Sequence, residues 1–202
     1  MGTNTPHLDH DGKKEYLGLH LFNELRWLLC AATEWSIQNK LNLEIEGYDV
    51  QVYALDSACL HARTLFEFFV QSTTNNYYGS NEFLGSPLIS TRYTNNWKGP
   101  LHSFLMHAQD RSHPAPLQSS GAQKNLNRMP VDFASEILRL WEEFEKKLGE
   151  SSDAKDQELQ LITRDQRKKA IEVASSVMRS SVAKDHAKST PEILEPVFVF
   201  SA

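Results

Sequence analysis

The chain contains little cysteine, glycine or proline. Its 202 residues include only 2 cysteines, 9 glycines and 8 prolines. Collagen-like, fully disordered and turn-rich all-β chains use more glycine and proline, so these classes are disfavoured. A chain of this length rarely depends on a single disulfide. Because Cys30 and Cys59 both fall within apolar helical patterns, we expect two buried free thiols.

Long apolar runs and a large excess of one charge are also missing. The longest apolar candidate, residues 25–33, is interrupted by Arg26 and is far shorter than the ~18 residues of a membrane helix. Residues 1–14 lack the apolar core of a signal peptide. The net charge of -5, from 21 basic and 26 acidic residues, disfavours nucleic-acid binding through bulk charge. We therefore expect a cytoplasmic protein with no membrane partner.

Apolar residues recur at three- and four-residue steps, which is typical of amphipathic helices. The sequence therefore predicts an all-α fold, a bundle of five helices with long polar loops. The helices are expected over about 14–41, 49–72, 98–110, 131–148 and 164–186. Residues 73–98 and 112–129 are polar and irregular, and loops of such length are often functional.

These segments suggest four parts of the chain. They are a flexible N-terminus (1–13), a helical bundle core (14–148), a charged linker (149–163) and a C-terminal helix with an apolar tail (164–202). The tail ends in Val197–Phe200, a run that we expect to dock as a strand or clasp on this chain or a partner.

Charge is distributed unevenly along the chain. Residues 48–130 hold only 11 of the 47 charged side chains, but four of the eight histidines: His61, His102, His107 and His113. The mixed-sign charge of residues 142–188 predicts solvated helix faces. A functional site is therefore expected in the charge-poor middle of the chain.

Three charged residues share one line on the predicted helix 49–72. Asp56, Arg63 and Glu67 are spaced seven and four residues apart, which places them within roughly 40° of each other on the helix. One interpretation is an ion-pair ladder with an i,i+4 pair of Arg63 and Glu67. The other is a polar seam that faces another helix and orients a phosphate or a histidine.

A second group of candidates lies on the predicted helix 98–110 and just after it. His107 and Arg111 are one turn apart, whereas His102 lies about 140° from His107 on a regular helix. The histidines are either boundary residues bonded to their neighbours, or His107 is a general acid or base with Arg111 as charge stabiliser. No P-loop, dinucleotide-binding fingerprint or zinc-type spacing is present, so we expect no cofactor and no metal.

Residues 53–69, a following loop with Trp97 and a helix that carries His107 and Arg111 resemble a group of uncharacterised bacterial helical proteins. At longer range the pattern, over about residues 14–148, resembles the HEPN superfamily. Many members of this superfamily are helical, dimerising, metal-independent ribonucleases of toxin or defence systems, with an Arg-x4-6-His motif. His107 matches the motif histidine, but His102 stands in the arginine position, so the motif is degenerate.

The resemblance implies a role for each candidate residue. His107 would act as general base on a 2′-hydroxyl or as acid on the leaving oxygen, with His102, Arg63 or Arg111 stabilising charge on the phosphorane. Asp56, Arg63 and Glu67 would be supporting residues. The partners implied are RNA or a nucleotide, and a second copy of the chain or another protein. The alternatives are a non-catalytic helical module that binds a protein or nucleotide, and an unrelated enzyme that uses the histidine-containing middle.

Overall fold

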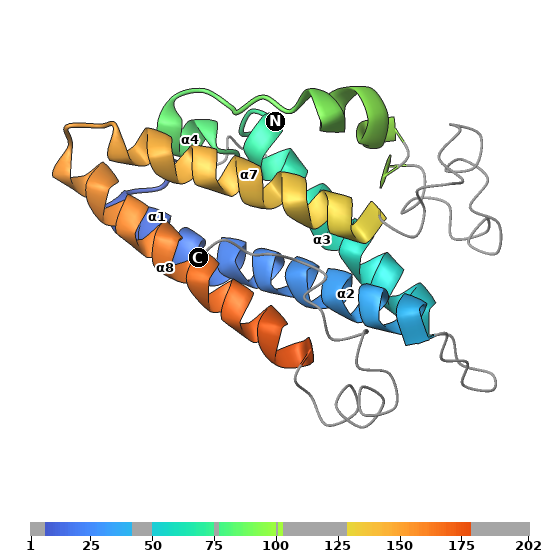
Figure 1. The fold of residues 1–202 in the computed structure, drawn as a ribbon. Coiled ribbons are helices and arrows are strands. Elements are labelled where there is room, and N and C mark those ends of the chain that lie inside the picture. The colour runs from blue at the N-terminus through green and yellow to red at the C-terminus, as the bar shows by residue number, and fades with distance from the viewer. Residues whose placement is uncertain (1–6, 42–49, 75–76, 100, 103–128, 179–202) are drawn as a thin grey trace.

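The structure is a computed structural model that describes residues 7–41, 50–74, 77–99, 101–102 and 129–178 (Figure 1). Its elements are α1 (His10–Glu15), η1 (Tyr16–Leu21), α2 (Phe22–Leu41), α3 (Val50–Val70), α4 (Asn81–Leu84), η2 (Tyr93–Trp97), α7 (Met129–Gly149) and α8 (Ala154–Met178). The described ranges contain helices and no strand, so the predicted all-α class is confirmed. No helix in these ranges is long and apolar enough to cross a membrane.

The first three elements form one continuous helix, in which η1 is a π-helical stretch between α1 and α2. The Asp9 carboxylate caps its start by accepting a hydrogen bond of 2.8 Å from the Gly12 amide. The helix therefore begins at His10, and the predicted start at about residue 14 is wrong. The polar first turn carries no apolar repeat, which is why periodicity placed the start too late.

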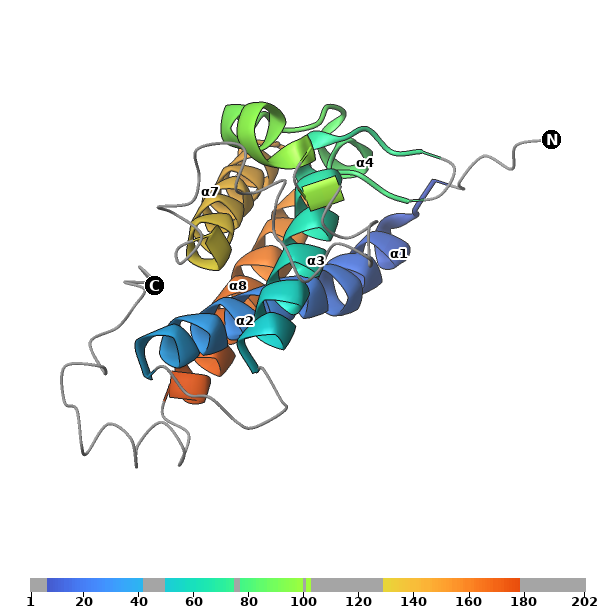
Figure 2. The same ribbon diagram turned by 90° about the vertical axis from the view of Figure 1, so that its right-hand side faces the viewer.

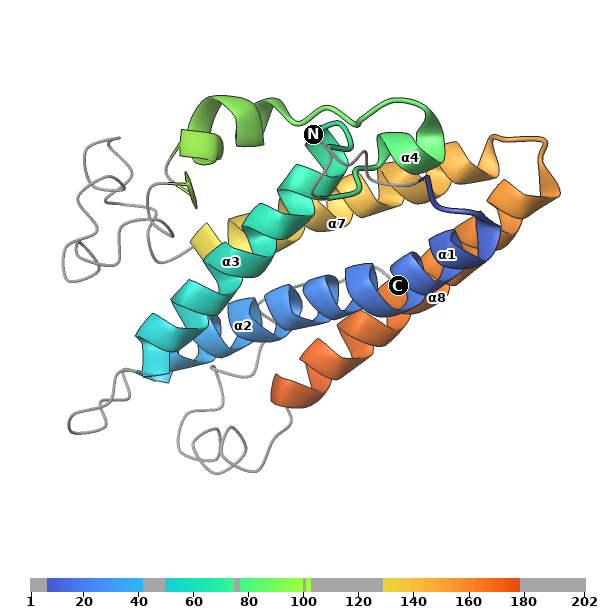
Figure 3. The same ribbon diagram turned by 180° about the vertical axis from the view of Figure 1, so that it is seen from behind.

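The core lies among α2, α3, α7 and α8. Helix α2 contacts both α3 and α8, and α7 contacts the other three (Figures 1 and 3). Edge-to-face aromatic pairs fill the space between α3 and α7, with the Phe69 ring 5.9 Å from the rings of both Trp141 and Phe144. The Trp141 indole Nε1 donates a hydrogen bond of 3.1 Å to the carbonyl of Thr163, which ties α7 to α8.

Helix α8 begins earlier than predicted. Residues 154–163 are helical, so the prediction of a charged linker over 149–163 is wrong for most of that range. The Asp153 carboxylate accepts a hydrogen bond of 2.9 Å from the amide of Lys155 at the first turn. Few side chains are buried in this part of the helix, among them Leu159 and Thr163. Such a narrow apolar stripe gives only a weak periodic signal.

The segment predicted as an irregular loop over 73–98 is partly helical. It contains α4 and a helix over 91–99 whose centre is η2, on the same side of the bundle as α3 and α7 (Figure 2). The amide and hydroxyl of Ser80 donate to the carbonyls of Phe68 and Phe69 at 2.7 and 2.8 Å, which returns the chain to the end of α3. A Cβ at Gly79 would collide with the Gln71 carbonyl, so this approach requires glycine.

The helix over 91–99 is fixed to α7 at its start. The Ser90 hydroxyl accepts a hydrogen bond of 3.2 Å from the Tyr93 amide and donates one of 2.8 Å to Oε1 of Glu136 on α7. Of the predicted helix 98–110, residues 98–99, at the end of the helix over 91–99, and residues 101–102 are helical. Residues 103–128 and 179–202, which include residues 112–128 of the predicted loop 112–129 and the apolar tail, lie outside the described residues.

Candidate functional site

Two of the charged residues predicted on α3 form an ion pair. Nε of Arg63 donates a hydrogen bond of 2.9 Å to Oε1 of Glu67, with side chains 26% and 21% exposed. This is the i,i+4 pair expected from the spacing. On an exposed helix such a pair stabilises by only about 0.2–0.5 kcal/mol, so its geometry is more informative than its energy.

His102 joins this pair from the end of the segment that folds over α3. Its Nε2 lies 3.3 Å from Oε1 of Glu67, the oxygen that Arg63 contacts. The distance is within ion-pair range, but the atoms are not aligned as a hydrogen bond. We call Arg63, Glu67 and His102 the Glu67 cluster. Its existence favours a polar seam between two elements over a ladder confined to α3.

The orientation of His102 separates its two ring nitrogens. Nε2 is buried against Glu67, whereas the side chain as a whole is 36% exposed. The exposed atoms of the His102 side chain therefore exclude Nε2, and the ring is open to solvent away from Glu67.

A buried tyrosine lies beside the cluster. The Tyr93 ring stacks on Phe66 with centroids 4.6 Å apart, and its hydroxyl is buried with no hydrogen-bond partner among the described residues. Burial, with a contribution from the Glu67 carboxylate, raises the pKa of the Tyr93 phenol, so it stays neutral. Gln71, just after α3, accepts a hydrogen bond of 2.7 Å at Oε1 from the hydroxyl of Tyr77.

The remaining predicted site residues do not join the cluster in the described structure. Asp56 lies two turns before Arg63 on α3, near Cys59; burial, with a contribution from this carboxylate, raises the pKa of the Cys59 thiol to about 12. His107 and Arg111 lie outside the described residues, so their predicted roles stay predictions. Cys59 is a buried free thiol as expected, whereas Cys30 is free but only half-buried.

A second imidazole–carboxylate pair lies between α2 and α3. Nδ1 of His61 is 2.8 Å from Oε2 of Glu24, and the His61 ring lies 5.0 Å from that of Trp27. Sequence reasoning placed His61 in the charge-poor middle but gave it no partner. Glu24 is 37 residues away in the chain, and no local spacing indicates such a contact.

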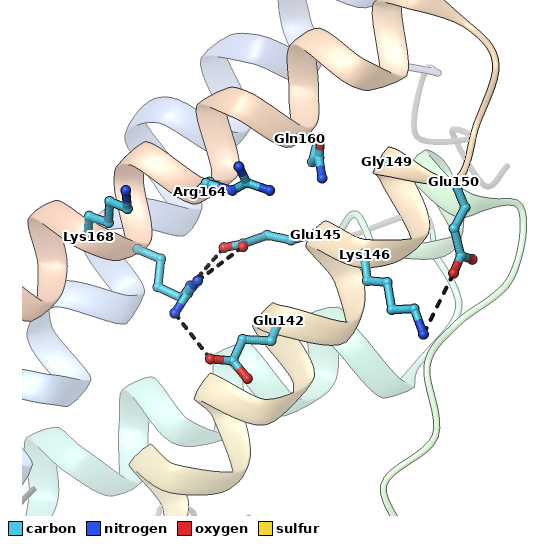
Figure 4. Close-up of a pocket in the computed structure, with 9 residues that line it drawn as sticks. Glu142, Glu145, Lys146, Gly149, Glu150, Gln160, Arg164 and Lys168 are labelled. Carbon is cyan, nitrogen blue, oxygen red and sulfur yellow. Dashed lines mark hydrogen bonds and ion pairs between the residues drawn. The ribbon is translucent and has the colours of Figure 1, made fainter. Parts of the chain in front are cut away.

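The charged region between α7 and α8 is not fully solvated, contrary to the prediction from its mixed signs. The side chains of Glu145 and Arg167 are only 7% and 11% exposed, and they form a hydrogen-bonded ion pair at 2.9 Å. They line a groove between the two helices (Figure 4). Glu145 and Arg167 are 22 residues apart in the chain. Their ion pair can therefore be predicted only when it is known that α7 and α8 are neighbours.

No three His, Cys, Asp or Glu side chains of the described residues gather in a way that could hold a metal ion. Comparisons of the chain with protein-family models, with curated proteins and with solved structures found no match. Function is therefore inferred from the residues of the chain and their geometry.

Proposed function

We propose that the chain is a HEPN-like helical protein that acts on RNA as a metal-independent ribonuclease of a bacterial toxin or defence system. The observation that supports this proposal best is the Glu67 cluster. There a carboxylate lies between a guanidinium and an imidazole whose ring is partly open to solvent. This set supplies a proton-transfer group, a group that orients it and a cation for phosphate.

In this mechanism His102 takes the proton of the RNA 2′-hydroxyl at Nδ1 while Nε2 faces Glu67. The 2′-oxygen forms a bond to phosphorus, the bond from phosphorus to the 5′-oxygen breaks, and the leaving oxygen takes a proton from a second acid. The resemblance allows His107 as base or as acid, and with His102 as the base the acid role falls to His107. Arg63 stabilises the charge of the phosphorane, and the products carry a 2′,3′-cyclic phosphate and a 5′-hydroxyl.

The charge of the cluster also determines how RNA would bind. One guanidinium and one carboxylate cancel, and a chain with net charge -5 does not attract RNA from a distance. Binding would depend on few phosphate contacts, so its salt dependence would be shallow.

The implied homodimer predicts a doubled mass by light scattering, and truncation after Pro196 is expected to change that mass if the apolar tail forms the contact.

The test is cleavage of a single-stranded RNA by purified protein in the presence of EDTA. His102→Ala should lower the rate by about 100-fold or more, the usual contribution of acid–base catalysis. His61→Ala is the matched control, because it removes an imidazole that also faces a glutamate but lies outside the cluster. Absence of cleavage by the wild-type protein at high concentration, or equal losses in the two variants, would rule the proposal out.

Glu67→Gln tests the positioning role separately. It keeps the shape of the side chain but removes the charge that faces His102 and Arg63. We expect a smaller rate loss than in His102→Ala, because the imidazole stays while the carboxylate that positions it is lost. A rate loss that follows the fraction of unfolded protein, measured by circular dichroism, would mean that Glu67 acts only on stability.

The second candidate is a non-catalytic module that binds a protein or nucleotide. It is favoured by large apolar side chains at the surface of α2 and α3, where Trp27, Tyr53 and Leu60 are 44%, 59% and 50% exposed. Exposed aromatic side chains are common at interfaces. If the wild-type protein does not cleave RNA, and Trp27→Ala abolishes binding of a partner while His102→Ala does not, this second function replaces the first.

A further inference from the structure

The groove between α7 and α8 has the size of a small-molecule site. It has a volume of about 620 Å³ and lies between the last turns of α7 and the turns of α8 around Gln160 to Lys168 (Figure 4). Pockets for small ligands usually fall within roughly 300–1,000 Å³. Unlike most such pockets, this one is lined almost entirely by charged and polar side chains, so its ligand must itself be charged.

The floor of the groove is a buried ion pair that a second, more exposed carboxylate joins. Arg167 donates to Oε1 and Oε2 of Glu145 at 2.9 and 3.3 Å and to Oε1 of Glu142 at 3.1 Å, contacts drawn as dashed lines in Figure 4. Because Glu145 and Arg167 are almost fully buried, breaking this pair would leave an uncompensated buried charge. The charge of Glu145 is therefore compensated within the groove, whereas Glu142, 54% exposed, is bound to Arg167 only through Oε1.

Two further cations line the groove without such compensation. Arg164 and Lys168 are one turn apart on α8, and neither forms an ion pair with another described residue, whereas Lys146 at the rim lies 3.8 Å from Glu150. Four basic residues and three carboxylates line the groove. The excess positive charge lies on α8, which contributes Arg164, Arg167 and Lys168 to the lining of the groove.

Gln160 completes this wall with an uncharged donor. Its carboxamide lies beside the Arg164 guanidinium in Figure 4, against Gly149 at the end of α7. A Cβ built on Gly149 would collide with this carboxamide. The Gln160 side chain can take this position because residue 149 is a glycine. A guanidinium, an amide and an ammonium group thus line one wall of the groove.

We propose that the α7–α8 groove binds the phosphate group of a small phosphorylated molecule. The planar guanidinium of Arg164 matches two oxygens of a phosphate, Lys168 adds a point charge, and Gln160 donates to a further oxygen. A tetrahedral phosphate offers enough oxygens for all three donors, whereas a carboxylate has two. The site is independent of the Glu67 cluster and does not depend on the ribonuclease proposal.

The experiment is a calorimetric titration of the full chain at constant ionic strength. Its arms are inorganic phosphate, adenosine monophosphate and acetate. Saturable binding of a phosphate ligand, with acetate much weaker, supports the proposal. Tighter binding of the nucleotide than of phosphate identifies a phosphorylated metabolite as the ligand, and equal binding identifies free phosphate. No saturable binding of either at millimolar concentrations overturns the proposal.

Two variants on the same helix locate the site. Arg164→Gln should weaken phosphate binding by about tenfold or more, since a charge-assisted contact of ~1.4 kcal/mol corresponds to tenfold in affinity. Lys169→Gln is the matched control, because Lys169 pairs with Asp165 at 2.7 Å and does not line the groove. Equal weakening in both variants would mean that only net charge matters and would overturn the site. If Arg164→Gln lowers helicity, Lys168→Gln provides the same comparison.

Discussion

The position of His102 depends on a buried carboxylate on α7. Glu136 is 5% exposed, accepts hydrogen bonds from Ser90 and Arg139 at 2.8 Å each, and lies 4.0 Å from Arg92. Through Ser90 it holds the start of the helix that runs over 91–99 towards His102. Glu136→Ala removes these interactions and should loosen that helix.

The size of the effect follows from the hydrogen bonds that Glu136 makes. A hydrogen bond to a charged group contributes roughly 1.5–3 kcal/mol, and weakening of a serine cap costs about 1 kcal/mol more. We therefore expect Glu136→Ala to lower the free energy of unfolding by about 2–4 kcal/mol. The matched control is Glu143→Ala, which removes the other, more exposed partner of Arg139 and should cost no more than about 1 kcal/mol.

Urea denaturation measures the free energies, and amide hydrogen exchange over residues 91–99 measures the local loosening. Burial raises the pKa of Glu136, but bonds from Arg139 and Ser90 outweigh it, so the folded-state pKa is lowered. This contribution to stability is complete above the unfolded pKa of about 4.5 and is lost as the pH falls through the folded value. Equal stability of the Glu136→Ala and Glu143→Ala variants, or unchanged exchange over residues 91–99, would refute the reasoning.

Three further predictions concern the core and the loop that returns to α3. Trp141→Phe removes the indole donor to the Thr163 carbonyl and leaves space in the core, so it should cost about 1–3 kcal/mol in urea denaturation; a smaller change would contradict the importance of this contact. Gly79→Ala forces a Cβ against the Gln71 carbonyl and should lower the melting temperature by several degrees, for a cost of about 1–3 kcal/mol. The Cys59 thiol is buried and its pKa is raised to about 12, so a thiol reagent at pH 8 should modify it only as fast as the chain unfolds.

The helices of the core could be predicted because each buries a periodic apolar face. The helix predicted over 49–72 is α3 (Val50–Val70), and the helix predicted over 131–148 is α7 (Met129–Gly149). The Arg63–Glu67 pair could be predicted too, since a spacing of four residues on a helix places two side chains together. These features depend on local geometry alone.

The features that were missed depend on contacts between distant segments. Glu67 meets His102, and Glu24 meets His61, only because α3 packs against both the segment over 77–102 and α2. The first turns of α8 were missed because their stability comes from packing of residues such as Leu159 rather than from a wide apolar face. Mixed charge over 142–188 predicts solvated helix faces, because the sequence does not show that Glu145 on α7 faces Arg167 on α8.

The central claim is that Glu67 and His102 act as one unit in RNA cleavage. The most direct test is a double-mutant cycle on the cleavage rate, with wild type, Glu67→Gln, His102→Ala and the double variant. If the carboxylate acts through the imidazole, the double variant should cleave no more slowly than His102→Ala alone. Losses that multiply in the double variant, or a wild-type protein that does not cleave RNA, would contradict the account.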